Sequence, residues 1–575
     1  MRTYVVLSLG GATLLCGGGA LLADSAASGA AHTPTTLSDG RVLPSIRSRT
    51  ISDDWVRPAN MLGDAELQSK GAVIGDIKID PRQIFDTSKS EDNTRLFRLA
   101  NRLHINTRQK TVATQLLFKS GDRYDPRVLE ETERLLRGAR YLYDARVRPV
   151  AYHDGKVDIE VITRDVWTLN PGVRFGRSGG KNSSGFELEE LNILGTGSRI
   201  SFSYKSDVDR KSKTLDFQDK QLFGSWWRGA ITYSDNSDGK TKFVLLDHPF
   251  YALEVHHAGG FSAQDDNRID SQYDRGKIVN EFDTRERDVT AYYGWSSGLR
   301  NGWVRRSSAG VTYDDNKFSR LPGSTLANRV PGDRKLVYPW VALDLIQDQF
   351  ERARNRDQIE RTEDFFLGWR ARAQLGFASS SAGSDRNSTI FSGYVGKGYL
   401  PSEATRFLWS ANATGRYENS ELRNGLFSAA ARFYTRQSVH RLLYVGLEAI
   451  AGSKLDAEQQ VLLGGDTGLR GYPLRYAGGD SKFLFTIEQR FYTDYYPFRL
   501  FNLGGAVFFD AGRVFGNNAL SNRPNTLLKD VGFGLRLGSS RSGLGGVIHV
   551  DVAFPLDGDT NIKNVQFLVE TKRGF

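Results

Sequence analysis

The sequence predicts a mostly β protein, in which a C-terminal transmembrane antiparallel β-barrel of about 16 strands follows a small α+β domain. Beyond the extreme N-terminus, the 575 residues contain no apolar run near the ~18 that a membrane-spanning helix needs. From about residue 170 onward, apolar and polar residues alternate, as in strands that face lipid on one side and a lumen on the other. The 33 Phe, 23 Tyr, 9 Trp and 60 Gly suit such a barrel, although this composition also fits a soluble all-β protein.

The N-terminus is typical of a secretory signal peptide, which we place at residues 1–31. Arg2 precedes an apolar stretch over residues 4–23, and small residues continue to Ala31, with cleavage possible after Ala23, Ala27 or Ala30. A helix that is not cleaved is the alternative. The single Cys lies in this segment, so the mature chain is expected to have no disulfide and no thiol chemistry. Residues 32–71 have few periodic apolar positions and several Pro, Ser and Asp, which predicts a linker.

The net charge of +10 at pH 7 is unchanged by removal of residues 1–31, which contain one Arg and one Asp. A basic protein can bind nucleic acid, yet no Lys/Arg-rich block is present and export would separate the chain from it. Anionic lipopolysaccharide or acidic polypeptide segments are the more suitable partners.

Residues 72–168 predict the α+β domain. Alternation over residues 73–79 indicates a strand, and the apolar residues between 96 and 103 fall on one face of a short helix. A second helix fits residues 109–118. After a third helix, strands over about 142–150 and 156–164 are joined at Asp154-Gly155, a hairpin turn signal.

The third helix has the clearest end signals in the chain. Asp125 can cap it, and Pro126 occupies the first helical position, where a missing N–H has no cost. Arg134 and Arg137 lie near its C-terminal end, which favours positive charge, and Gly138 ends it. The domain resembles a POTRA domain, a periplasmic polypeptide-transport module, in its element order and in the run LLFKSGDRYDPRVLEETERLLRGARYLYDARV. The helix after the first strand departs from that pattern.

Residues 169–575 predict the barrel. In SRISFSYKS, Ile200, Phe202 and Tyr204 share one face and polar residues share the other. The same alternation in KFLFTIEQRFY places Glu488 on the polar face, which must line the lumen because charge is costly on the lipid face. Roughly 400 residues at ~25 per strand and connection give about 16 strands, with 14 or 18 also possible. The terminal Phe575 is typical of outer-membrane barrels.

The segment GGDTGLRGYP, residues 464–473, predicts a Gly-rich loop rather than a strand. Its Arg470 is either in water or bound to a partner. Glu488 and, in FFDAGRVF, Asp510 both fall on the lumen face of the following strands. An Arg on a loop folded into a lumen with two wall carboxylates favours a charge-assisted pair.

These residues resemble the signature of the outer-membrane protein assembly and translocation superfamily, which includes BamA, TamA and the two-partner-secretion transporters (bacterial surface antigen barrels). In that superfamily a loop tip folds into the lumen and its Arg meets the Asp of an F-x-D-x-G strand motif. The resemblance assigns these roles to the tip Leu469, Arg470, Gly471 and Tyr472, to the wall partners Glu488 and Asp510, to the strand motif residues Phe508 and Gly512, and to the C-terminal barrel signal Phe575.

An enzyme is the less favoured interpretation. His549 and Asp551 share one strand face and could orient an imidazole, but a lumen or rim pair is the simpler explanation. No H-E-x-x-H motif occurs, and no G-x-S-x-G lies in a strand-to-helix context. We therefore expect no enzymatic activity, no metal and no cofactor.

The resemblance implies a Gram-negative outer-membrane protein with its N-terminal domain in the periplasm. It implies insertion or translocation of unfolded polypeptide clients, contact with outer-membrane lipid or lipopolysaccharide, no nucleic acid, and a monomer as the favoured state. The alternatives are a dedicated two-partner-type secretion pore for one exported protein, and a passive pore or surface receptor on the same scaffold.

Overall fold

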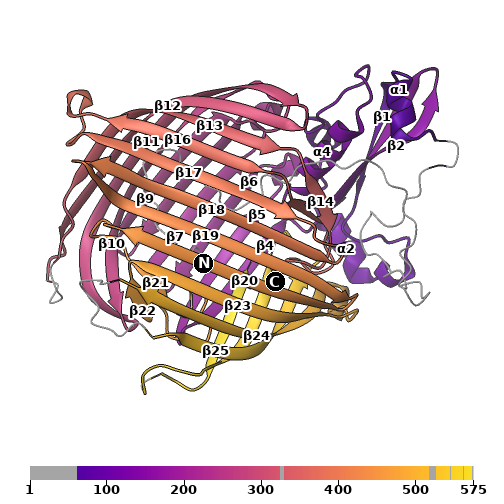
Figure 1. Cartoon of the computed structure of the whole chain (residues 1–575). Helices are drawn as coiled ribbons and strands as arrows, with labels where there is room; N and C mark the ends of the chain where they lie inside the picture. The colour runs from indigo at the N-terminus through magenta and orange to yellow at the C-terminus, as the bar shows by residue number, and fades with distance from the viewer. Residues whose placement is uncertain are drawn as a thin grey trace.

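The computed structural model describes Pro58, residues 61–323, 329–516, 526–543, 546–560 and 562–572, and Gly574. A small N-terminal domain lies against one end of a large β-barrel (Figure 1). The predicted signal peptide, most of the predicted linker and Phe575 lie outside the described residues. No helix in the described part of the chain is long and apolar enough to cross a membrane.

The N-terminal domain packs helices on a three-stranded sheet of order β1-β3-β2, in which β3 pairs parallel with β1 and antiparallel with β2. Leu67 of α1 is fully buried in the domain core, so the end of the segment predicted as a linker is part of the folded domain. The elements are α1 (Asp64–Ser69), β1 (Val73–Arg82), η2 (Ser90–Asp92), α2 (Arg95–Leu103), α3 (Gln109–Ala113), α4 (Pro126–Arg137), β2 (Leu142–His153) and β3 (Lys156–Asp165).

Helix α4 begins at Pro126, and the side chain of Asp125 accepts a hydrogen bond from the backbone N–H of Arg127 at 2.9 Å. Leu129 and Leu136, which lie on the same helical face, are buried in the domain core. A turn at Asp154 joins strands β2 and β3. Asp154 has a φ of 47°, which lies in the left-handed region that Asp tolerates.

The barrel has 20 strands, which corrects the prediction of about 16. The estimate of ~25 residues per strand was too large because β4 to β9 are only 8–10 residues long and follow one another closely. The wall strands are β4 (Leu169–Ser178), β5 (Lys181–Glu190), β6 (Arg199–Ser206), β7 (Lys211–Asp219), β8 (Arg228–Asn236), β9 (Gly239–His248), β10 (His257–Asp274), β11 (Lys277–Arg300), β12 (Trp303–Arg320), β13 (Arg334–Gln347), β16 (Arg370–Ala378), β17 (Ser388–Tyr399), β18 (Thr405–Glu418), β19 (Glu421–Ser438), β20 (Arg441–Ser453), β23 (Ser481–Tyr492), β24 (Phe501–Phe515), β25 (Leu528–Ser539), β26 (Val547–Pro555) and β27 (Gln566–Lys572).

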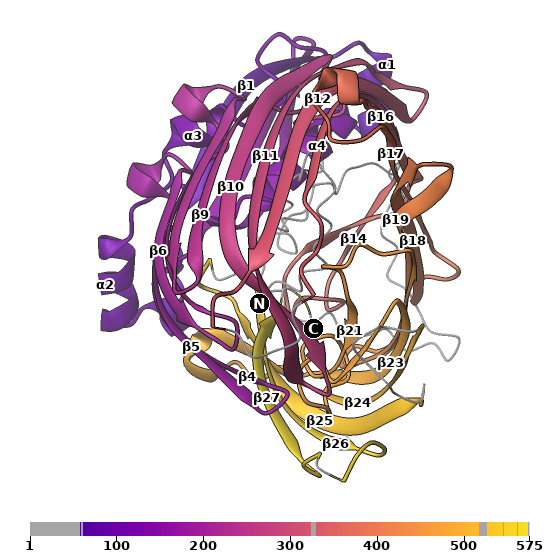
Figure 2. The same cartoon turned by 90° about the vertical axis from the view of Figure 1, so that its left-hand side faces the viewer.

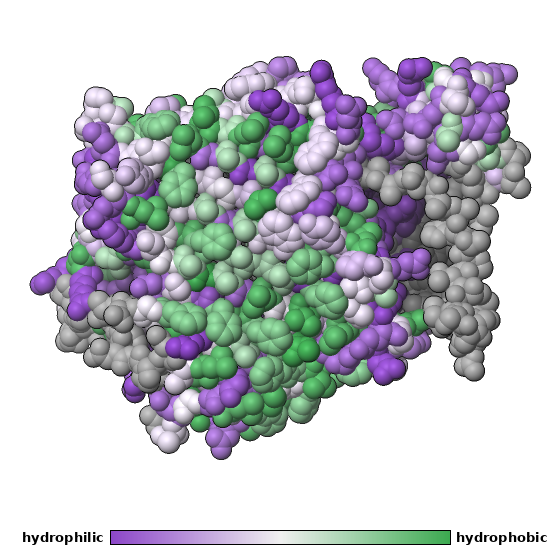
Figure 3. Space-filling model, viewed as in Figure 1, coloured by the Kyte–Doolittle hydropathy of each residue, from purple (hydrophilic) through white to green (hydrophobic). Residues whose placement is uncertain are grey.

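The outer face of the wall is largely apolar, as the space-filling view shows for one side (Figure 3). Ile200, Phe202 and Tyr204 of β6 are exposed, while Ser201 between them is buried. The same alternation exposes Val289 of β11 and buries Thr290 beside it. The wall therefore has the apolar exterior and polar interior expected of a barrel in lipid.

The first and last wall strands make the weakest pairing of the barrel. Among the described residues, strand β27 pairs with β4 through one residue pair in register, Val569 and Arg177, whereas it pairs with β26 over seven. The strands on both sides of this seam are short: β27 has 7 residues and β4 has 10, against 24 in β11. The seam is thus the part of the wall that is held by the fewest backbone hydrogen bonds.

Two small hairpins interrupt the wall order and lie inside the ring of strands in the end-on view (Figure 2). The first, β14 (Phe350–Ala353) with β15 (Glu363–Phe366), connects β13 to β16 at the end of the barrel next to the N-terminal domain. The second, β21 (Val461–Leu463) with β22 (Ala477–Gly479), connects β20 to β23 at the opposite end. We call residues 348–369 the lumen hairpin and residues 454–480 the lumen loop.

Candidate functional site

The tip of the lumen loop is buried inside the barrel. Leu469 and Tyr472 are fully covered, and Arg470 is 5% exposed. Short-range backbone bonds fix the tip: the N–H of Leu469 donates to the carbonyl of Gly464 at 3.0 Å, and the N–H of Tyr472 donates to that of Leu469 at 3.1 Å. Gly468 has a φ of 118°, a conformation that favours glycine, so the loop can turn sharply just before Arg470.

Arg470 binds two carboxylates of the barrel wall. Its Nε and Nη2 donate to the two oxygens of Asp510 at 2.6 and 2.8 Å, which is a bidentate pair. Its Nη1 donates to Glu488 at 2.7 Å. The structure therefore brings together the loop residue and both wall residues that the sequence singled out.

The strand motif completes the surroundings of the guanidinium. The Cζ of Arg470 lies 3.4 Å from the centroid of the Phe508 ring, a cation–π contact on the same strand face as Asp510. Asp510 also accepts a hydrogen bond from the Thr486 hydroxyl at 2.8 Å. At Gly512, a Cβ would stand 3.0 Å from Leu463 of the lumen loop, so this glycine permits a close approach between wall and loop.

Gly471 and Tyr472 hold the tip against strands β25 and β26. A Cβ on Gly471 would lie 2.7 Å from the Cβ of Asp530 and 3.0 Å from the backbone nitrogen of Pro555. The Tyr472 hydroxyl donates to the carbonyl of Lys529 at 2.8 Å. Asp530 is itself buried directly opposite Asp510 in the strand register, a position that sequence alternation alone does not reveal.

The lumen loop is also attached to the far walls of the barrel. Arg475 makes a bidentate pair with Asp209, at 2.6 and 2.7 Å, and its guanidinium lies 4.4 Å from the Tyr273 ring centroid. Asp456 accepts two hydrogen bonds from Arg416, at 2.8 and 2.9 Å, and one from Arg334 at 2.9 Å. The loop thus spans the lumen rather than lying along one side of it.

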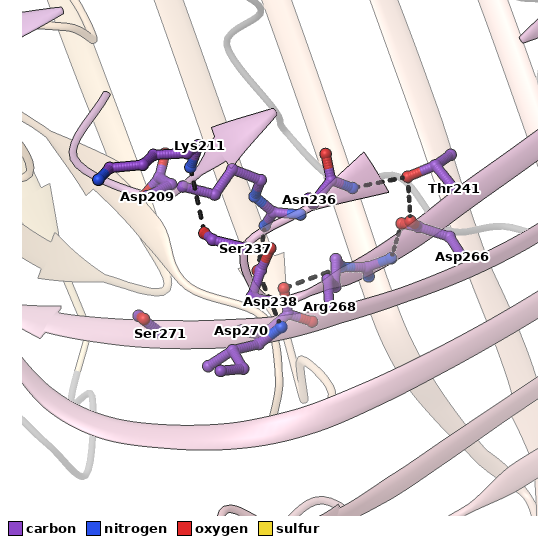
Figure 4. A network of polar contacts seen from close by, with 12 residues as sticks. Asp209, Lys211, Asn236, Ser237, Asp238, Thr241, Asp266, Arg268, Asp270 and Ser271 are labelled. Atoms are coloured by element: carbon purple, nitrogen blue, oxygen red, sulfur yellow. Dashed lines mark hydrogen bonds and ion pairs between the residues drawn. The ribbon is translucent and has the colours of Figure 1, made fainter. Parts of the chain in front are cut away.

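A polar network supports the Asp209 anchor (Figure 4). The next residue, Arg210, pairs with Asp238 at 3.4 Å, and Asp238 accepts the backbone N–H of Ile269 at 3.1 Å. On the same strand, Arg268 donates to Asp266 at 2.7 Å and to Asp270 at 2.9 Å. These contacts tie the Asp209 turn to strand β10 and give Arg475 a fixed partner.

The lumen hairpin enters the site from the opposite end and is bound to the N-terminal domain. Arg137 of α4 makes a bidentate pair with Asp364, at 2.9 and 2.6 Å. Glu133, one helical turn earlier, accepts a hydrogen bond from Arg352 at 3.0 Å. The Tyr143 hydroxyl of β2 donates to the backbone carbonyl of Glu360 at 3.0 Å.

The turn of the hairpin contacts lumen-facing residues of the wall. Asn502 donates to the carbonyl of Ile359 at 3.1 Å, and Tyr434 donates to Asp357 at 3.0 Å. Arg490 donates to the carbonyl of Arg356 at 2.7 Å. The side chain of Ile359 is buried in an apolar cluster with Tyr434, Leu442, Tyr492, Ala506 and Val547.

Sequence reasoning missed the lumen hairpin and the role of Arg490. The charged run FERARNRDQIERTEDFF looks like an ordinary exposed loop, because its partners in the wall are far away in the sequence. Arg490 carried a detectable signal, since it falls two residues after Glu488 on the same strand face.

His549 and Asp551, the residues considered for catalysis, lie on β26 beside the Arg470 site. Asp551 pairs with Arg536, and the Nε2 of His549 lies 2.8 Å from the carbonyl oxygen of Gly574. Within the described residues, no group of three or more His, Cys, Asp or Glu side chains is placed to hold a metal ion.

Comparison with known proteins adds only distant similarities. No family model and no curated protein matches the chain. Among solved structures, CdiB from Escherichia coli aligns with 87% of this chain and 76% of its own, at 11% identity and a TM-score of 0.44. BamA from Haemophilus ducreyi lacking POTRA domains 1–3 aligns with 86% of this chain and 84% of its own, at 12% identity and a TM-score of 0.35. The FrpB iron transporter from Neisseria meningitidis aligns with 75% of this chain and 84% of its own, at 10% identity and a TM-score of 0.38. At such values these similarities carry no argument about function, which rests on the lumen contacts of the chain itself.

Proposed function

We propose that this protein is an outer-membrane factor of the BamA, TamA and two-partner-secretion superfamily that inserts or translocates polypeptides and has no enzymatic activity. The observation that carries the proposal is the binding of Arg470, on the tip of the lumen loop, to Glu488 and Asp510 of the wall. Removing a guanidinium from water is costly unless charged partners replace the water, so this arrangement favours one defined position of the loop.

The lumen loop and the lumen hairpin support a gated barrel. Each crosses part of the lumen, and each is held by ion pairs that water could replace if the segment moved. Arg490 contacts both systems, because it donates to Glu488 at 3.0 Å as well as to the hairpin carbonyl of Arg356. Passage of a polypeptide through the lumen would require both segments to move.

The seam between β27 and β4 supports insertion as the main activity. Beyond the single pair of Val569 and Arg177, the edges of these strands can offer N–H and C=O groups to another strand. A client hairpin could add to such an edge by backbone hydrogen bonding and enter the membrane sideways. The strands on both sides of the seam are also short, with 7 residues in β27 and 10 in β4.

The N-terminal domain, which we assign as a single POTRA-like domain in the periplasm, would receive the client. Its strand β2 lies at one edge of the sheet. The lumen hairpin occupies part of that edge, where Arg361 donates to the carbonyl of Leu142 at 3.3 Å. A client strand that added to β2 there would compete with the hairpin, which would link client arrival to opening of the lumen.

The second candidate is a dedicated secretion pore, whose lumen the lumen loop and the lumen hairpin would close. A passive pore or receptor has no comparable support in the geometry.

The first experiment compares the outer-membrane and secreted proteomes of a deletion strain with those of its parent. Loss of several barrels from the membrane supports insertion, loss of one secreted protein supports a dedicated pore, and no change in either contradicts polypeptide handling.

A disulfide across the seam tests the route taken by the client. The substitutions Arg177→Cys and Val569→Cys are in register, so oxidation would close the seam without touching the lumen. If clients are inserted sideways, the oxidised variant fails to complement the deletion and a reductant restores it. Complementation by the oxidised variant would contradict the seam route and favour passage through the lumen.

A further inference from the structure

We propose that helix α2, with the neighbouring barrel turns, is a membrane-docking surface that holds the N-terminal domain against the phospholipid leaflet on its side of the barrel. Leu96, Leu99 and Leu103 lie along one face of this nine-residue helix and all are exposed, Leu96 by 68%. Exposed leucines at this spacing form an apolar stripe, and a helix with such a stripe and basic residues can lie in a membrane interface. The proposal rests on the barrel being in a membrane, as proposed above.

The exposed stripe is not a sign of a loosely held helix. Phe97, on the inner side, stacks on Phe85 with ring centroids 4.0 Å apart. Asn101 donates to the carbonyl of Phe85 at 2.8 Å and accepts its N–H at 3.2 Å. The hydroxyl of Thr94 accepts the N–H of Phe97 and caps the helix. The domain therefore fixes one side of α2 and presents the leucine side outward.

The helix is attached directly to the end of the barrel. Asp92, just before α2, pairs with Arg499 at 3.2 Å and with Arg541 at 3.1 Å, and both arginines belong to turns between wall strands. Arg541 also donates to the carbonyl of Ile84 at 2.5 Å. In the end-on view α2 lies outside the ring of wall strands, where a bilayer would surround the barrel (Figure 2).

Three turns between wall strands present further exposed apolar side chains. Leu194 in η3 (Ile193–Gly195), Phe223 in η4 (Leu222–Gly224) and Phe498 in η6 (Pro497–Arg499) are exposed, and Phe223 is completely so. Each has a φ between 51° and 57°, a region in which bulky residues are uncommon. Phe498 directly precedes Arg499, the residue that binds Asp92 next to α2. The η6 turn thus places an exposed aromatic side chain beside the residue that anchors the start of α2.

Charge also favours phospholipid over a protein surface. Arg95 and Arg102 are exposed and fall on one border of the leucine stripe, given about 100° of rotation per residue. At a bilayer, such side chains reach the phosphate groups while their methylenes lie along the apolar layer. Acidic residues are absent from α2 itself, so the surface suits a leaflet that contains anionic phospholipid.

The test measures the surroundings of α2 in the full chain, reconstituted in vesicles of phosphatidylethanolamine and phosphatidylglycerol. Single cysteines replace Leu96, Leu99 or Leu103 in a Cys16→Ser background, and each carries a nitroxide spin label. Collisions with oxygen, which concentrates in the bilayer, are compared with collisions with a water-soluble nickel chelate. Arg98, next to Leu99 but turned away from the stripe, is the matched control. Val341 on the outer wall reports whether the barrel itself is in lipid.

We expect the ratio of oxygen to nickel collisions to be higher at all three leucines than at Arg98. Dominant nickel collisions at the leucines would overturn the proposal, because the stripe would be in water. Low collisions with both reagents would also overturn it, because protein would cover the stripe. A Val341 label outside lipid would instead contradict the membrane barrel. Each labelled variant must keep the parent's heat-dependent shift on gel electrophoresis, which reports a folded barrel.

Discussion

Arg490 and Glu488 form an ion pair of 3.0 Å on one face of strand β23, and each also binds a different segment inside the barrel. Glu488 accepts from Arg470 of the lumen loop at 2.7 Å, and Arg490 donates to the carbonyl of Arg356 in the lumen hairpin at 2.7 Å. Residues two apart on a strand share a face, so one wall strand connects the segments that enter from the two ends. The positions of the loop and the hairpin are therefore expected to depend on each other.

Replacement of Arg470 by Ala is expected to release the lumen loop without unfolding the barrel. The substitution leaves Asp510 buried without Arg470, while Glu488 keeps Arg490 as its cation. Loss of one member of a buried pair costs about 3–5 kcal/mol. The wall keeps its backbone ladder, so the heat-dependent gel shift should persist. We expect higher ion conductance in planar bilayers and impaired complementation of the deletion.

Arg470→Lys is the control that separates the effect of the positive charge from the effect of the bidentate geometry. Lys keeps the charge but cannot make the bidentate pair with Asp510, so an intermediate conductance is expected. Asp510→Ala should resemble Arg470→Ala. Full activity at normal abundance in either alanine variant would show that the pair does not set the position of the loop.

Gly471→Ala is expected to displace the tip for a steric reason. The added methyl would lie 2.7 Å from the Cβ of Asp530, closer than carbon atoms can approach, so the loop or strand β25 must shift. The matched control is Gly393→Ala in β17, where the nearest atom would be 3.8 Å away. Proteolysis of the lumen loop in intact vesicles should increase for Gly471→Ala alone, and equal cleavage in both variants would contradict the proposed fit.

Arg490→Met should loosen the loop and the hairpin together. The variant keeps much of the side-chain volume but removes the donors to Glu488 and to the Arg356 carbonyl. Arg423→Met serves as control, because the Arg423–Glu421 pair is exposed and such pairs contribute little to stability. Hydrogen exchange of peptides from both lumen segments is the measurement. Faster exchange in only one segment would argue against coupling through β23.

The Arg470 contacts could be anticipated only with the family resemblance, because local patterns leave Arg470 either in water or bound to a partner. Glycines around Arg470 predict a loop, and strict alternation puts Glu488 and Asp510 on the lumen face. Asp530 could not be found in this way. Its position opposite Asp510 depends on the register between β24 and β25, which alternation leaves open.

The number of strands and the burial of the lumen hairpin could not be predicted from the sequence, for two different physical reasons. The count failed because strands β4 to β9 are shorter than the average that was assumed, and strand length varies around this barrel from 7 to 24 residues. The lumen hairpin was not predicted because a run of charged residues is normally exposed to water. Here Asp364, which is largely buried, pairs with Arg137 of α4, more than 200 residues earlier in the chain, so only the tertiary structure supplies the partner that compensates for its burial.

The contact between the N-terminal domain and the hairpin is expected to weaken in acid through Glu133. Burial alone would raise the pKa of Glu133, but Arg137, Arg146 and Arg352 outweigh it and lower the pKa from 4.5 to about 2. Since the folded pKa is the lower one, the carboxylate stabilises the domain fully above about pH 4.5, and this stabilisation is lost as the pH falls toward 2. A shift of this size corresponds to on the order of 3 kcal/mol.

Urea unfolding of the full chain at several pH values between 6 and 2 tests this, with helical circular dichroism reporting the N-terminal domain. Glu133→Gln keeps the size of the side chain but cannot ionise, so it should be less stable than the parent at pH 6. The difference between the two proteins should shrink as the pH falls from about 4.5 to about 2, because the parent's carboxylate then becomes neutral as well. Other carboxylates titrate equally in both proteins and cancel in this comparison. A difference that stays constant across the range would show that the charge of Glu133 does not stabilise the domain.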